Sequence, residues 1–120
     1  MISTGEQGYA LGVPTNDYSG RLANQLVVPG HLLVYGFTVS STNAAAQYVL
    51  MFDAQTLPAD TAVPILFLNV AAGQSAGVSW TPQGREFLTG FVLCTSSTAA
   101  TKTINATADA FFDVQYDVID

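Results

Sequence analysis

The chain has 120 residues, of which 49% are apolar and only 10% are charged, and its 9 acidic residues against 3 basic ones give a net charge of −6. This length fits one domain around one core, and the shortage of bases argues against nucleic acid and against a membrane surface as partners. Because so few side chains are charged, the surface must consist mostly of neutral groups, which are easily buried against another protein. The composition therefore indicates assembly.

Residues 1–20 form the first segment. Gly is frequent in them and apolar residues are scattered, which predicts an extended N-terminal arm. Two interpretations stay open, because such an arm can order on a partner or add to a neighbour's sheet, whereas a frayed terminus would have the same composition. The arm has neither the basic start nor the apolar stretch of a signal peptide, so we expect synthesis in the cytoplasm without one.

Residues 21–120 are predicted to form a single β-domain, because short β-prone runs alternate there with Gly, Pro, Asn and Asp. The expected strands span residues 21–28, 31–40, 47–53, 63–70, 77–81, 85–95, 100–104 and 110–119. In the strand at 31–40, alternation places four residues on one face: Leu33, Tyr35, Phe37 and Val39. In the strand at 110–119, four residues are expected to face the core: Phe112, Val114, Tyr116 and Val118.

The fold class predicted from these runs is all-β. No segment keeps a helical apolar period for three turns, and strands without crossover helices form antiparallel sheets. Seven to eight strands at this spacing predict a two-sheet sandwich of the jelly-roll kind. An immunoglobulin-like sandwich is the alternative, but the tyrosine corner and the Cys–Trp–Cys pattern are missing.

The sequence does not indicate an enzyme. Nucleophilic catalysis needs a base beside a Ser or Cys, and the chain has one His and one Cys. His31 follows a Pro-Gly turn, where we expect an ordinary exposed side chain, and Cys94 lies in an apolar run, where we expect a buried, inert thiol. One His and one Cys are also too few to bind zinc. We therefore predict no catalytic residue and no cofactor.

Calcium is the one metal that the sequence leaves open. Hard oxygen ligands are available in two predicted loop regions, from Asp53 and Asp60 in one and from Asp109 and Asp113 in the other. No Asp-x-Asp-x-Asp-Gly loop is present, so the ligand set is incomplete. Turn formation is the favoured interpretation of these carboxylates.

Three residues are candidates for contact with a subunit or ligand: Trp80, Arg85 and Glu86. The segment that holds Trp80 runs into a turn, where its ring could bind a sugar instead of packing in the core. Arg85 and Glu86 are adjacent at the start of a predicted strand and should point to opposite faces. At least one of them is expected to lie at a subunit contact or to pair across strands.

Several turn and strand sequences resemble those of small β-sandwich virion proteins of tailed bacteriophages, the decoration or auxiliary proteins of heads and related components of tails. The segments that carry the resemblance are Phe52-Asp53-Ala54, Leu57-Pro58-Ala59-Asp60-Thr61-Ala62-Val63-Pro64, Gly84-Arg85-Glu86-Phe87-Leu88-Thr89-Gly90 and Ser96-Ser97-Thr98-Ala99-Ala100-Thr101. The similarity covers roughly residues 47–118. It implies a non-enzymatic oligomer, often a trimer, that docks on other virion proteins.

Two hypotheses for function follow. In the first, the chain is a virion structural protein, a capsid decoration protein that forms trimers through its neutral surface and docks on the major capsid protein. In the second, it is a carbohydrate- or receptor-binding sandwich of a tail or fibre, which uses Trp80 and loop Asp residues. The first needs a broad interface of about 800 Å² per partner, and the second needs an exposed aromatic platform.

Overall fold

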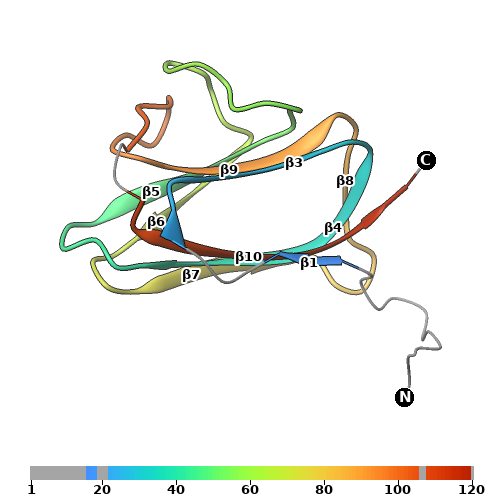
Figure 1. The fold of residues 1–120 in the computed structure, drawn as a ribbon, viewed down its shortest axis with the longest axis horizontal. Coiled ribbons are helices and arrows are strands. Elements are labelled where there is room, and N and C mark those ends of the chain that lie inside the picture. The colour runs from blue at the N-terminus through green and yellow to red at the C-terminus, as the bar shows by residue number, and fades with distance from the viewer. Residues whose placement is uncertain (1–15, 19–21, 106–107, 120) are drawn as a thin grey trace.

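The computed structural model describes residues 16–18, 22–105 and 108–119. These residues form ten strands in two antiparallel sheets that face each other (Figure 1), and none of them is helical. The strands are β1 (Asn16–Tyr18), β2 (Leu22–Ala23), β3 (Gln25–Pro29), β4 (Leu32–Ser41), β5 (Gln47–Phe52), β6 (Leu66–Val70), β7 (Ser75–Ser79), β8 (Arg85–Phe87), β9 (Gly90–Ser96) and β10 (Ala110–Val118). The all-β, two-sheet class predicted from the sequence is confirmed.

The strand order is that of a jelly roll. The first sheet runs β1-β10-β4-β7, with β2 also on β10 and β8 also on β4, and the second runs β3-β9-β5-β6. The antiparallel pairs are nested along the chain: β1 and β2 pair with β10, β3 with β9, β4 with β7 and β8, and β5 with β6. A long hairpin rolled up on itself produces this nesting, which defines the double-sheet jelly roll.

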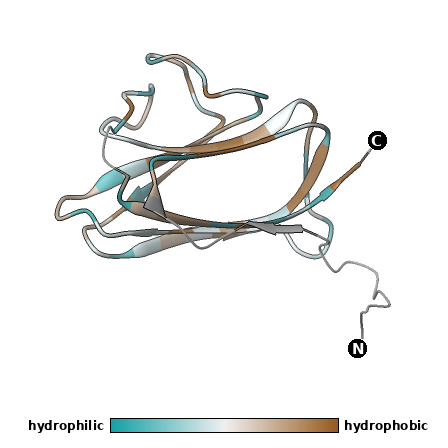
Figure 2. Cartoon of the chain, in the orientation of Figure 1, coloured by the Kyte–Doolittle hydropathy of each residue, from teal (hydrophilic) through white to brown (hydrophobic). Residues whose placement is uncertain are grey.

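The core lies between the two sheets and is rich in aromatic rings. Phe91 of β9 packs at 5.0 Å from Phe87 of β8 and at 5.8 Å from Phe37 of β4, measured between ring centroids. All three side chains are buried. Figure 2 shows that hydrophobic residues dominate the facing strands and that hydrophilic ones gather in the loops and at strand ends. The rings of three strands therefore join the sheets.

A second apolar cluster covers the outer face of the sheet formed by β3, β9, β5 and β6. Its buried members are Leu50, Phe52, Val92 and Cys94, from the middle strands β5 and β9. Residues of the two loops at 53–65 and 97–105, among them Leu57 and Ile104, pack against these side chains, and both loops lie above this sheet in Figure 1. The loops explain why β9 is buried along its whole length. The expected burial of Cys94 is confirmed.

Two predicted strands are each divided between the sheets. The strand expected at 85–95 is two strands, because the chain turns at Leu88 and Thr89 and passes from β8 in one sheet to β9 in the other. The strand expected at 21–28 is likewise divided into β2 and β3. The short strand expected at 100–104 is reduced to a single bridge between Ser96 and Ile104.

The alternation predicted for the strand at 31–40 is wrong in its first half, because β4 contains a bulge. Gln115 of β10 lies opposite Gly36, and the next residue, Tyr116, lies opposite Val34. No residue of β10 therefore lies opposite Tyr35 in the strand register. The extra residue exchanges the two faces of the strand. Leu32 and Val34 therefore join Phe37 and Val39 in the core, whereas the Tyr35 hydroxyl donates a hydrogen bond to Asp117 at 3.0 Å.

The first and last described strands, β1 and β10, pair with each other in one sheet. Asn16–Tyr18, within the predicted arm, forms β1 and pairs with β10 in the register Asn16 to Tyr116, whereas residues 1–15 and 19–21 lie outside the described residues.

Phe112 and Val114 of β10 are buried as predicted. Val118 is 55% exposed, which corrects its expected place in the core, because it is the last residue of the strand.

Candidate functional site

Trp80 follows β7 and lies half-buried against the core. Its backbone N–H donates to the Tyr35 carbonyl at 2.8 Å, and its ring lies 5.9 Å from that of Phe37 and 6.4 Å from that of Phe87. The Arg85 guanidinium is 5.6 Å from the centroid of the Trp80 ring, which is the range of a cation–π contact. The ring thus packs between core phenylalanines and a cation. The ring is only partly buried, and its role as a ligand or subunit contact stays a prediction.

Glu86 contacts the residue that precedes β4. Its carboxylate lies 2.6 Å from Nε2 of His31, and the backbone of Glu86 pairs with Leu33, two residues further along. Both side chains are substantially exposed to solvent. The contact joins β8 to the residue directly before β4, so Glu86 has a partner on the neighbouring segment of the sheet. A role of either residue in a subunit interface stays a prediction.

His31 lies at the start of one sheet, directly before β4, and Cys94 lies in the other sheet. His31 lies beside β4, whereas Cys94 is part of the apolar cluster on the outer face of the other sheet. Burial raises the pKa of the Cys94 thiol to about 11, so the thiol stays protonated at neutral pH and is a poor nucleophile.

Asp53 holds the corner between β8 and β9. Its carboxylate accepts hydrogen bonds from the backbone N–H groups of Leu88, Thr89 and Gly90 at 3.1, 2.9 and 3.2 Å, and from the Thr89 hydroxyl at 2.7 Å. These donors satisfy the backbone at the point where the chain changes sheets. The role of Asp53 in the described structure is to form this corner.

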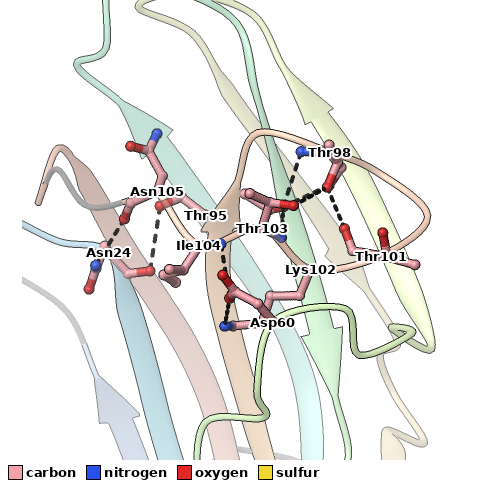
Figure 3. A network of polar contacts seen from close by, with 10 residues as sticks. Asn24, Asp60, Thr95, Thr98, Thr101, Lys102, Thr103, Ile104 and Asn105 are labelled. Carbon is pink, nitrogen blue, oxygen red and sulfur yellow. Dashed lines mark hydrogen bonds and ion pairs between the residues drawn. The ribbon is translucent and has the colours of Figure 1, made fainter.

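Asp60 and Lys102 join the two loops that cover the outer apolar cluster (Figure 3). The Lys102 side chain is only 3% exposed, and its Nζ donates to Oδ1 of Asp60 at 2.5 Å. The backbone N–H of Ile104 donates to the same oxygen at 3.3 Å. The hydrogen bond from Lys102 is the main cause of the lowered pKa of Asp60. The pair holds the two loops together.

Asp109 belongs to a polar network at the start of β10. Nδ2 of Asn43 donates to Asp109 at 2.6 Å, and Nε2 of the buried Gln47 donates to it at 3.2 Å. The backbone carbonyl of Asp109 accepts a hydrogen bond from the N–H of Thr42 at 2.8 Å. The network satisfies polar groups that are buried between β4, β5 and β10.

The four predicted calcium ligands all have partners within the protein. Asp53, Asp60 and Asp109 take part in the contacts given above, and Asp113 accepts a hydrogen bond from Gln115 at 2.7 Å. Within residues 22–105 and 108–119, no three His, Cys, Asp or Glu side chains come together as a metal would require. Calcium binding, which the sequence leaves open without predicting it, is not tested by these contacts.

The sequence interpretation missed one surface, the uncharged side formed by β6 and β7. No residue from 61 to 84 is charged, and this run contains β6, the last strand of one sheet, and β7, which lies at the edge of the other. The two strands contact each other across the sandwich. We call β6 and β7, with residues 63–65 before β6, the neutral edge. The uncharged run is visible in the sequence, but only the strand order shows that both strands are edges.

Comparisons with known proteins return little. No protein-family model matches the chain, and no curated protein sequence matches it. Among solved structures, the coat protein of Tobacco streak virus is similar, with 11% sequence identity, coverage of 88% of this chain and 90% of that chain, and a TM-score of 0.37. A TM-score this low does not establish a common fold, so the jelly-roll assignment rests on the strand order. The described residues contain no helix that could span a membrane.

Proposed function

We propose that the chain is a non-enzymatic structural protein of a virus particle, a decoration or auxiliary protein of a bacteriophage capsid that self-associates and docks on other virion proteins. The observation that carries the proposal is the neutral edge, an uncharged and partly apolar side of a jelly roll in a chain whose net charge is −6. Exposed apolar edge strands are avoided in monomeric proteins because they invite pairing with another chain. The resemblance of residues 47–118 to phage proteins favours a trimer.

Three side-chain contacts of the described residues serve the fold itself. Glu86 is paired with His31, Lys102 is paired with Asp60, and the carboxylate of Asp53 is bound by backbone N–H groups. Each of these contacts joins two segments that are distant in sequence. Such a distribution suits a protein that must keep a rigid shape in a particle, and the surface left for partners is largely neutral.

The proposal is tested by locating the chain in virus particles. Particles purified from the source culture are dissociated, and the chain is quantified by mass spectrometry against the major capsid protein. We expect a fixed ratio of the two proteins across gradient fractions and many copies per particle. A chain that stays in the soluble fraction and is absent from purified particles would contradict a virion role.

A further inference from the structure

The neutral edge carries a row of exposed apolar side chains. Val63, Ile65 and Phe67 are 72%, 48% and 49% exposed, and they alternate with the core-facing Leu66 and Leu68. Phe67 lies in β6, and Val63 and Ile65 lie in the segment directly before it, so the three exposed residues form one apolar strip along the chain. The strip continues onto β5, because the ring of Tyr48 packs edge-on against Phe67 with 6.2 Å between centroids.

The backbone of β6 is open on its outer side. On its inner side it pairs with β5 from Leu66 opposite Met51 to Val70 opposite Gln47, and no other described strand pairs with it. Natural edge strands are protected by charged residues, Pro or bulges. β6 has none of these protections. It contains no charged residue, its pairing with β5 shows no bulge, and Pro64 lies before the strand and not in it. The edge is therefore able to accept another strand.

The distribution of charge indicates which partner fits this edge. The chain carries 9 acidic residues, and β10 has Asp113 and Asp117 on it, so a basic partner would be attracted to β10 rather than to the neutral edge. Two copies of an acidic chain repel each other, and burying carboxylates of both copies in one contact would be costly. The neutral edge lets a second copy approach without placing any charge in the contact.

We infer that the neutral edge is buried against a second copy of this chain, with β6 adding to a sheet of that copy. The inference rests on the proposed function and names the surface through which self-association occurs. Main-chain pairing would supply affinity, and the apolar strip would supply burial. A stable interface covers about 800 Å² per partner, more than one short strand offers, so the contact also includes β7, whose outward residues Ser75, Gly77 and Ser79 are small.

The test compares two matched substitutions by sedimentation velocity over a range of protein concentrations. Phe67→Lys places a cation in the apolar strip, and Leu88→Lys makes the same charge change at a side chain that is 66% exposed and lies at the β8–β9 corner. Both changes lower the net negative charge, so weaker repulsion between copies cannot explain a loss of association. We expect Phe67→Lys to weaken self-association at least 10-fold and Leu88→Lys to leave it within about twofold.

A second readout does not depend on a variant. Hydrogen exchange of the wild-type chain is followed at low and high concentration, and the amides of β6 should become protected as the oligomer forms. The inference would be overturned if the wild type is an oligomer, folded Phe67→Lys has the same mass, and exchange in β6 does not depend on concentration. Self-association itself would then stand, through another surface. A wild type that stays monomeric at every concentration would instead contradict the self-association in the proposed function.

Discussion

Asp53 shows how one side chain fixes a turn of the fold. Its carboxylate accepts four hydrogen bonds from residues 88–90, and Asp53→Asn would replace one acceptor oxygen by a donor that faces N–H groups. Hydrogen bonds to charged groups contribute more than neutral ones, but Asp53 is exposed to solvent, so we expect a loss of about 1 kcal/mol in the free energy of unfolding. Urea unfolding of both proteins at pH 7 measures it.

The same pair of proteins gives a pH dependence of known sign. Partial burial raises the pKa of Asp53, but its hydrogen bonds to Thr89, Leu88 and Gly90 lower it more, so the net shift is downward. A carboxyl whose pKa is lower in the folded state stabilises the fold above its ordinary pKa of about 4, and this contribution is lost as the pH falls further. The difference between wild type and Asp53→Asn should therefore shrink below about pH 4. A difference that stays constant down to pH 2 would contradict this role.

Lys102 and Asp60 differ in burial, and this predicts unequal effects of removing either one. Lys102→Met removes the buried charge and keeps an unbranched apolar chain, leaving a carboxylate that is half exposed to water. Asp60→Ala leaves the buried ammonium of Lys102 without its carboxylate, which is the costlier state. We expect Asp60→Ala to lower the midpoint of thermal unfolding more than Lys102→Met. The reverse order would show that the pair does not hold the loops as described.

Strand β7 depends on a close approach to β4. A Cβ added at Gly77 would lie 2.5 Å from the Phe37 carbonyl oxygen and 3.2 Å from the Thr38 Cα, both backbone atoms. We expect Gly77→Ala to separate the two strands and to destabilise the fold by about 1–3 kcal/mol, as overpacking does. Ser79→Ala in the same strand is the control, with an expected change below about 0.5 kcal/mol. Equal unfolding midpoints in urea for the two variants would refute the close approach.

The sequence predicts those elements whose pattern is local. The alternation around Phe112 and Val114 correctly places the core side of β10, and the strand predicted at 47–53 matches β5. The bulge at Tyr35 was not predictable from this alternation, because it is defined by the register against β10. The change of sheet at residues 88–89 depends likewise on Asp53, which lies 35 residues earlier in the chain.

The candidate site was predicted less well than the fold. Arg85 and Glu86 do make defined contacts, but their partners, Trp80 and His31, are selected by the pairing of β8 with β4. The exposed strip of Val63, Ile65 and Phe67 was predicted as part of a strand at 63–70, without its position at the edge. Hydrophobicity alone cannot distinguish a core strand from an exposed edge, because both are apolar. The strand order distinguishes a core strand from an edge strand. That order depends on contacts between residues that lie far apart in the sequence.

Considered as a whole, the molecule combines a rigid jelly roll with an uneven distribution of charge. None of the residues in the four strands β3, β9, β5 and β6 is charged, whereas β8 and β10 of the other sheet carry four charged residues: Arg85, Glu86, Asp113 and Asp117. The neutral edge, which takes one strand from each sheet, can contact copies of the chain, whereas the acidic strand β10 is left for solvent or for a different partner. This asymmetry supports the proposed assignment of the chain to an assembly.

The native mass in solution tests this assignment most directly. Light scattering over a wide range of protein concentrations, with calcium and with a chelator, gives the mass without any assumption about shape. We predict a closed oligomer, three times the chain mass of 12.6 kDa, with the same mass in both conditions, because closed symmetry is the usual end state of self-association. A mass of one chain at every concentration would contradict the assignment.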